Sequence, residues 1–158
     1  MIIDVVIVST SRHQKFGPVE NPEEAEDLSG QAILDRLRGE SCKFTYRLIP
    51  DGVEAVREAI LASEADVVIL CGGTGVAPKD LTIEAAEPLF DKTIPGFGEV
   101  FRLKSLDEVG TRAILTRASA GVVRGVPVFC LPGSPSAARL GIDLILAEID
   151  HILQHISE

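Results

Sequence analysis

The sequence predicts an α/β protein, a three-layer αβα sandwich around a mostly parallel central sheet. Short apolar runs rich in valine and isoleucine alternate along the chain with longer segments whose apolar residues recur at helical spacing. Such alternation is typical of parallel strands covered by helices on both faces. The chain has 158 residues, a length that suits one domain spanning residues 1–158.

Three strands are expected in the first half of the chain. Residues 4–8 are rich in β-branched side chains, residues 44–49 alternate between apolar and polar, and residues 67–70 are all apolar. A loop is expected over residues 12–22, which contain a glycine and two prolines. These runs predict the central strands of the sheet.

Two helices are expected between these strands. One begins at Pro22, with Asn21 as its N-cap, and ends near Gly39. Its apolar residues recur at helical spacing, as they do in the second helix, over residues 53–63. Each helix therefore follows one strand and precedes the next.

The second half of the chain is expected to complete both layers. Residues 81–110 are predicted to be mostly helical, with Thr82 as a possible cap. Residues 116–124 and 126–131 read as a hairpin or a pair of strands, and residues 136–156 as the terminal helix. The predicted order of elements favours a sheet whose strands end at one common edge.

Bulk properties exclude several classes of protein. A formal net charge of -9 argues against a nucleic-acid binder, which would present a basic face. No apolar run approaches the roughly 20 residues of a membrane span, and the first residues lack the basic start of a signal peptide, so a cytoplasmic protein is expected. The three cysteines are isolated from one another, which argues against a zinc site.

The most informative segment follows the strand at residues 67–70 and reads Cys71-Gly-Gly-Thr-Gly-Val-Ala-Pro-Lys-Asp80. Glycines at this position let backbone N–H groups approach an anion, and Thr74 adds a hydroxyl donor. The spacing matches neither the P-loop nor the dinucleotide fingerprint. A tight connection without any ligand would use the same glycines, so the loop alone leaves both interpretations open.

Four loops are expected to meet at the carboxyl edge of the sheet, at residues 9–11, 50–52, 72–80 and 132–135. They would bring hydroxyls, glycine amides and the carboxylates of Asp51 and Asp80 into one crevice. Either aspartate could instead serve only as a turn residue or a helix cap. The convergence nevertheless favours a binding site over ordinary turns.

Basic residues gather between positions 102 and 124 of this acidic chain. They indicate either a site for a small polyanion or a solvated surface with mixed charge. Lys79 and Arg102 are candidate phosphate ligands.

Several motifs together resemble one known family. They are Cys71-Gly-Gly-Thr-Gly-Val-Ala-Pro-Lys-Asp-Leu-Thr82, Pro95-Gly-Phe-Gly-Glu-Val-Phe-Arg102 with Ser105, Thr116-Arg-Ala118 and Leu131-Pro-Gly-Ser-Pro135. The chain resembles the MoaB/MogA family, the molybdopterin adenylyltransferases of molybdenum-cofactor biosynthesis, which are related to the G domain of gephyrin. Val8-Ser-Thr-Ser-Arg12 favours the MoaB branch.

The resemblance implies an activity and an assembly. Family members join ATP to molybdopterin with Mg²⁺, which gives adenylyl-molybdopterin and pyrophosphate, and the product then receives molybdate or, in some archaea, tungstate. They form homotrimers or homohexamers. Some paralogues are inactive molybdopterin-binding or carrier proteins, which is the alternative function; a scaffold like gephyrin is the less favoured third.

The resemblance also assigns site residues. It implies that Asp51 and Asp80 are catalytic and bind the metal. It implies substrate binding by Ser9, Ser11, Gly72, Gly73, Thr74, Gly75, Glu99, Arg102, Ser105, Thr116, Pro132, Gly133 and Ser134. Thr116 replaces a serine that is common in the family, and Ser134 stands where many relatives have asparagine or serine; both keep an oxygen.

Overall fold

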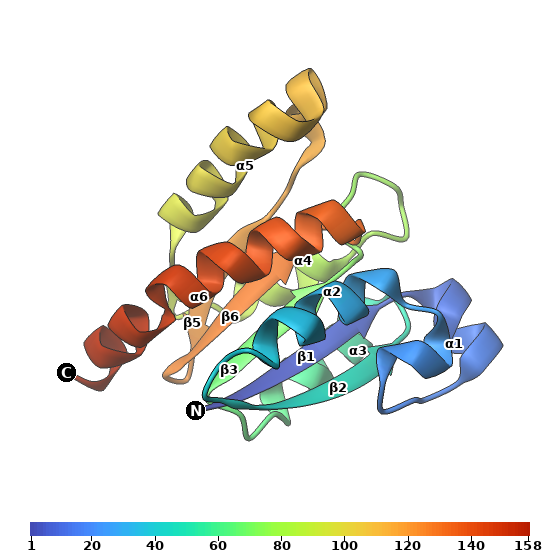
Figure 1. Cartoon of the computed structure of the whole chain (residues 1–158), viewed down its shortest axis with the longest axis horizontal. Coiled ribbons are helices and arrows are strands. Elements are labelled where there is room, and N and C mark those ends of the chain that lie inside the picture. Colours follow the sequence, from blue (N-terminus) through green and yellow to red (C-terminus); the bar gives the residue numbers. More distant parts are fainter.

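The computed structural model describes residues 1–158 and has a six-stranded sheet at its centre, in the order β2-β1-β3-β6-β5-β4 (Figure 1). The strands are β1 (Ile2–Val8), β2 (Lys43–Ile49), β3 (Val67–Cys71), β4 (Lys92–Thr93), β5 (Ser119–Val123) and β6 (Val126–Leu131). Strands β2, β1, β3 and β6 are parallel, whereas β5 runs antiparallel to both of its neighbours. The predicted mostly parallel sheet is therefore confirmed.

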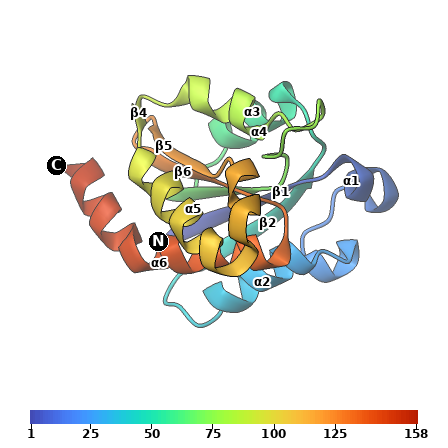
Figure 2. The same cartoon turned by 90° about the horizontal axis from the view of Figure 1, so that it is seen from above.

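Helices cover both faces of the sheet (Figure 2). On one face lie α2 (Leu28–Leu37) and α6 (Pro135–Ser157), and on the other lie α3 (Val53–Leu61) and α4 (Thr82–Ala86). The 15-residue α5 (Pro95–Val109) leans away from the rest of the molecule in Figure 1. This arrangement confirms the three-layer αβα sandwich.

Two hydrophobic cores hold the layers together, because side chains of a strand point alternately to opposite faces. Ile3, Val5 and Ile7 of β1 pack in the core beneath α2 and α6, and Val6 and Val8 pack in the core beneath α3 and α4. Each such side chain contributes about 1.5–3 kcal/mol when fully buried. None of the helices combines the length and the apolar composition needed to cross a lipid bilayer.

Residues 10–16 form a helix, α1 (Thr10–Phe16), although most of this segment was expected to be a loop. Ser9 has an extended backbone and its Oγ accepts a hydrogen bond from the Arg12 N–H at 3.4 Å, which caps the helix. Gly17 ends the helix with a φ of 71°. The glycine and prolines that suggested a loop lie after this short helix.

The helix expected to begin at Pro22 is divided in two. Asn21 is an N-cap as predicted, but the segment that follows it is a short 3₁₀ helix, Pro22–Ala25. The chain then turns through Glu26, whose φ is 50°, before Asp27 caps α2. The division arises because Asp27 Oδ1 accepts the Gly30 N–H at 3.0 Å and thereby starts a new helix.

The segment from residue 81 to 110 is also more divided than expected. A 3₁₀ turn, Glu87–Leu89, and the short β4 separate α4 from α5; Pro88 lies within the turn and Pro95 begins α5. Thr82 does not cap α4; its hydroxyl donates to the Gly72 carbonyl oxygen at 2.7 Å. The predicted hairpin is confirmed as β5 and β6, preceded by a 3₁₀ segment, Gly110–Leu115.

Candidate functional site

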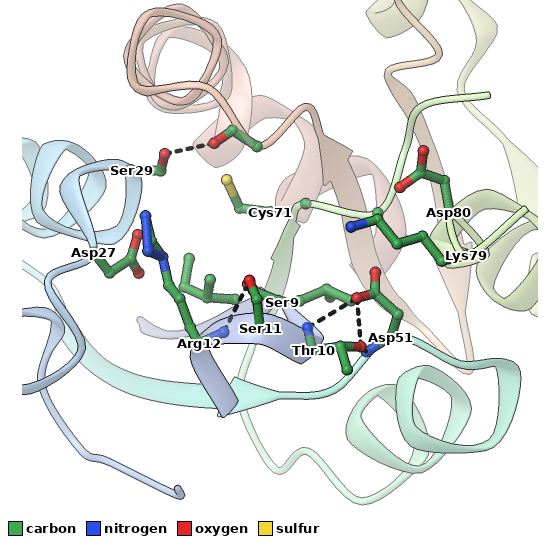
Figure 3. A pocket seen from close by; sticks show the side chains of 15 residues that line it. Ser9, Thr10, Ser11, Arg12, Asp27, Ser29, Asp51, Cys71, Lys79 and Asp80 are labelled. Carbon is green, nitrogen blue, oxygen red and sulfur yellow. Dashed lines mark hydrogen bonds between the residues drawn. The ribbon is translucent and has the colours of Figure 1, made fainter. Parts of the chain in front are cut away.

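A polar cavity of about 270 Å³ lies at the carboxyl ends of the parallel strands (Figure 3). In the sheet, β2 lies on one side of β1 and β3 lies on the other. The direction in which successive strands are added therefore reverses between β1 and β3. Ligands of open α/β sheets bind at such reversal points. Each of the four predicted loops supplies lining residues, namely Ser9, Ser11, Asp51, Gly72, Gly73, Asp80 and Gly133.

The glycine loop after β3 requires glycine for steric reasons. Gly72 and Gly73 have φ values of 109° and 66°, which side chains rarely adopt. A Cβ on Gly72 would overlap the Val8 carbonyl oxygen, and a Cβ on Gly73 would overlap the Thr82 hydroxyl. The loop backbone therefore packs directly against β1 and α4 at the edge of the cavity.

Asp51 is held by Thr10 on the neighbouring loop. Its Oδ2 accepts hydrogen bonds from the Thr10 N–H at 2.9 Å and from the Thr10 hydroxyl at 2.7 Å. Its Oδ1 faces Gly73, at 3.1 Å from where a Cβ on that glycine would stand. One carboxylate oxygen is thus occupied by the protein, and the other remains available at the cavity.

Asp80 shows the same division of roles between its oxygens. Its Oδ2 accepts the Ala77 N–H at 3.0 Å and lies over Gly75, which has no side chain to obstruct it. No hydrogen bond within the chain occupies its Oδ1. The cavity therefore brings together two carboxylates that each present one free oxygen.

The two carboxylates match the preferences of a hard divalent cation that is also bound by oxygens of a substrate. Carboxylate oxygens are the ligands that Mg²⁺ prefers, and Mg²⁺ sites commonly use one or two carboxylates together with water and substrate phosphates. No group of three or more acidic, histidine or cysteine side chains is placed to hold a metal ion. Asp51 and Asp80 would thus supply two ligands of Mg²⁺, and its other oxygens would come from hydroxyls, backbone carbonyls, water or substrate.

The other side of the cavity is built around a buried carboxylate. Asp27 is 3% exposed, and its Oδ2 accepts the Tyr46 hydroxyl at 2.7 Å. Ser29, also buried, donates its hydroxyl to the Gly133 carbonyl oxygen at 2.7 Å. These bonds join α2 to β2 and to the loop after β6, which makes this wall rigid.

Cys71 lines the cavity but serves as a core residue. Its Sγ lies 3.4 Å from the Pro132 carbonyl oxygen, and burial raises the pKa of its thiol. The thiol therefore stays protonated near neutral pH, and a protonated thiol is a poor nucleophile. Cys71 is therefore a buried core residue and not a reactive thiol.

Several residues implied by the resemblance lie outside the cavity lining. Thr74, Gly75, Pro132 and Ser134 belong to the loops around it, and the Ser134 hydroxyl caps α6 by accepting the Ala137 N–H at 3.3 Å. Glu99, Arg102, Ser105 and Thr116 belong to α5 and the segment after it. No residue between positions 102 and 124 lines the cavity.

Arg102 and Arg117 bind other parts of the chain. Arg102 Nη1 donates to the carbonyl oxygens of Thr116 at 3.5 Å and Ala118 at 3.3 Å. Arg117 donates to the Gly75 carbonyl oxygen at 3.2 Å and pairs with Glu84, which braces the glycine loop from outside. The structure thus uses both guanidinium groups to hold its own backbone.

The polar lining residues that the sequence did not identify as site residues include Thr10, Arg12, Asp27 and Ser29. Thr10 and Arg12 lie beside the predicted Ser9 and Ser11, so their position in the same motif was the available signal. Asp27 and Ser29 lay within an expected helix, and only the start of α2 at this point places them at the cavity.

Comparison with known proteins identifies relatives over nearly the whole chain. Residues 4–151 match the family described as "Probable molybdopterin binding domain". The chain is 46% identical over 142 residues to "Molybdopterin adenylyltransferase" of Pyrococcus furiosus, covering 85% of this chain and 83% of the relative. It is 44% identical over 137 residues to "Molybdenum cofactor biosynthesis protein B" of Bacillus subtilis, covering 82% of this chain and 81% of the relative.

The fold is also that of a solved relative. The crystal structure of the tungsten cofactor synthesizing protein MoaB from Pyrococcus furiosus superposes with a TM-score of 0.82 and 42% sequence identity. The match covers 99% of this chain and 97% of that one. With this agreement in sequence and fold, the chain belongs to the molybdopterin-binding family of molybdenum-cofactor biosynthesis proteins.

Proposed function

We propose that this protein is a molybdopterin adenylyltransferase that acts in molybdenum- or tungsten-cofactor biosynthesis. It would join Mg-ATP to molybdopterin and release adenylyl-molybdopterin and pyrophosphate. The observation that carries the proposal is that Asp51 and Asp80 line one cavity together with the glycine loop. A relative 46% identical to this chain is named for the same reaction.

The proposed reaction needs no general base from the protein. The terminal phosphate of molybdopterin is a monoester whose second pKa is about 6, so it is largely ionised at neutral pH. One of its oxygens bonds to the α-phosphorus of ATP, and the bond from that phosphorus to the pyrophosphate group breaks. The obstacle is repulsion between anions, so positioning and charge neutralisation carry the rate.

The residues of the cavity match these needs. Asp51 and Asp80 would hold Mg²⁺ through their free oxygens, and the bound ion would offset the negative charge of the nucleotide phosphates. Lys79 points into the cavity from the same side as the two aspartates (Figure 3). The backbone of Gly72 and Gly73 lines the same cavity, where a phosphate group could approach it.

The proposal is tested with Asp80→Asn in an anaerobic assay of pyrophosphate release from molybdopterin and Mg-ATP. The substitution keeps the shape of the side chain and its contact with the Ala77 N–H, but it removes the charge. We expect turnover to fall by about 100-fold or more while molybdopterin binding is retained. Asp150→Asn, at an exposed position of α6, is the matched control and should leave turnover unchanged.

Undiminished turnover by Asp80→Asn would refute the role assigned to this residue. If the wild-type protein binds molybdopterin tightly but releases no pyrophosphate, the alternative function of a molybdopterin-binding carrier is correct. Binding and turnover are measured separately on the same preparation, so a protein that only binds molybdopterin can be told from one that also reacts it.

We propose further that the protein assembles as a homotrimer or homohexamer through an apolar surface on α5 and the 3₁₀ segment after it. This α5 surface consists of Val100, Leu103, Leu106, Val109, Ile114 and Leu115, each between 42% and 81% exposed. Large contiguous apolar patches on soluble proteins mark interaction sites. Because α5 leans away from the body, its apolar side chains are free to meet a second copy of the chain (Figure 1).

The assembly proposal is tested by the mass of the particle in solution. Leu103→Lys, at a residue 66% exposed, should reduce the oligomer to smaller species in light scattering after size-exclusion chromatography. Leu28→Lys, at a residue 68% exposed on α2, introduces the same charge elsewhere and should leave the mass unchanged. A monomeric wild-type protein would refute the assembly.

A further inference from the structure

Arg12 differs from the other half-buried arginines of this chain in having no acceptor for its guanidinium group. The others all donate to protein oxygens: Arg47 to Asp4 and the Ala59 carbonyl, Arg57 to the Ala85 carbonyl, Arg102 to the Thr116 and Ala118 carbonyls, and Arg117 to Glu84 and the Gly75 carbonyl. The remaining arginines are exposed, so water can satisfy any donors that lack a protein partner. Arg12 is thus partly removed from water without a hydrogen-bond acceptor in the protein for its guanidinium.

The Arg12 side chain extends from α1 into the cavity, on the side where Asp27 lies (Figure 3). Its backbone N–H is fixed by the Ser9 hydroxyl at 3.4 Å, which sets the point from which the side chain extends. Asp27 accepts the Gly30 N–H and the Tyr46 hydroxyl, and it forms no hydrogen bond with the guanidinium. The carboxylate nevertheless lines the same wall of the cavity, where its negative charge attracts the guanidinium.

A guanidinium carries five N–H donors in a planar fork and has no acceptor of its own. Donors that are partly desolvated and unpaired are unfavourable, whereas an oxyanion that pairs with the fork is bound through two parallel hydrogen bonds. The cavity is polar, and apart from Arg12 its only cation is Lys79, on the opposite side. The free fork therefore points to an anionic ligand.

We infer that Arg12 binds a phosphate oxyanion of a substrate in this cavity. The identity of that phosphate rests on the proposed function, which supplies two sources: the phosphate of molybdopterin and the phosphates of ATP. Two anionic substrates must come together in the proposed reaction. Arg12 and Lys79 on opposite sides of the cavity would each offset the charge of one of them.

The experiment measures ligand binding to the whole protein, with Arg12→Gln, Arg12→Lys and the wild type compared by calorimetric titration. ATP with Mg²⁺, molybdopterin and pyrophosphate are titrated separately. We expect Arg12→Gln to weaken binding of its ligand by about tenfold or more, as loss of a hydrogen bond to a charged group predicts. Arg12→Lys keeps the charge but not the planar fork of donors. The affinity of this variant should therefore lie between those of the wild type and Arg12→Gln.

Arg124→Gln is the matched control, because it removes the same charge at an exposed position of the β5–β6 hairpin, which lies at the opposite edge of the sheet. It should bind all three ligands as the wild type does. Weakening for molybdopterin alone identifies the pterin phosphate as the partner of Arg12. Weakening for ATP or pyrophosphate identifies the nucleotide phosphates.

Equal affinities of Arg12→Gln and Arg124→Gln for all three ligands would overturn the inference. Because the Arg12 guanidinium has no bond within the chain, the thermal unfolding temperature of Arg12→Gln should match that of the wild type. The binding result is independent of turnover: a protein that releases no pyrophosphate but loses anion affinity on Arg12→Gln would refute the proposed reaction and retain this inference.

Discussion

Thr10 and Asp51 hold each other through reciprocal hydrogen bonds between the loops that follow β1 and β2. Both the N–H and the hydroxyl of Thr10 donate to Asp51 Oδ2, and the Asp51 N–H donates back to the Thr10 hydroxyl at 2.9 Å. The hydroxyl thus donates one bond and accepts another. This arrangement fixes the orientation of the Asp51 carboxylate before any ligand enters.

Thr10→Val should weaken the proposed Mg²⁺ site. Valine fills the same volume but removes the hydroxyl, which leaves Asp51 Oδ2 with one donor instead of two and the Asp51 N–H without its acceptor. We expect the Mg²⁺ concentration for half-maximal pyrophosphate release to rise by about tenfold, since loss of a partner that orients a ligand typically costs 10–100-fold.

Thr10→Ser is the control for that prediction, because it retains the hydroxyl and should restore the wild-type requirement for Mg²⁺. A Thr10→Val protein with an unchanged Mg²⁺ requirement would show that Thr10 does not position Asp51 for metal binding.

Gly73→Ala should destabilise the protein by about 1–3 kcal/mol, because alanine is strained at a φ of 66°. The new Cβ would also overlap the Thr82 hydroxyl, which itself holds the Gly72 carbonyl oxygen. Denaturation in urea measures the free energy of unfolding. Gly96→Ala is the control: nothing lies within 4 Å of the added Cβ, and the position is helical, so stability should be unchanged or slightly higher.

The thiols should react with a neutral-pH thiol reagent in a fixed order. Cys42 is half-buried, whereas Cys71 and Cys130 are buried. Burial raises the pKa of all three thiols, so the expected order of reaction follows their exposure. Only the thiolate reacts, so Cys42 should be modified in the native protein and the other two only after unfolding. Rapid modification of all three cysteines in the native protein would contradict this burial.

Tyr46→Phe should lower the free energy of unfolding by about 1–3 kcal/mol at neutral pH, because it removes the hydroxyl that donates to the buried Asp27. Burial and the adjacent Asp27 raise the pKa of Tyr46 above its ordinary value of 10.0. The unfolded chain therefore releases the phenolic proton first, so the stability that Tyr46 provides decreases once the pH exceeds about 10.

The effect of pH on the free energy of unfolding tests the role of Tyr46 separately. Unfolding in urea at neutral pH and near pH 11 should show a smaller alkaline loss of stability in Tyr46→Phe than in the wild type. An identical alkaline loss in both proteins would show that Tyr46 titrates normally in the folded state.

The fold class and the meeting of the four loops could be predicted because both follow from local patterns. Runs such as residues 67–70 are apolar throughout, as a strand covered on both faces must be, and strands joined by right-handed crossovers end at one edge. Asp51 follows a predicted strand directly and Asp80 ends the glycine loop after another, so their presence at one cavity was predictable. The helix at Thr10–Phe16 was not, because its cap is a single side-chain hydrogen bond at Ser9.

The sequence alone determined the class of fold, the edge of the sheet that carries the site and the family whose motifs lie there, because these depend on residue type and order along the chain. Only the tertiary structure decided which arginine is free to bind a ligand. Arg102 stands in a family motif but donates to carbonyl oxygens of Thr116 and Ala118, whereas Arg12 lines the cavity without an acceptor. Whether a charged side chain is already paired depends on neighbours distant in sequence, and these are defined only when the chain has packed.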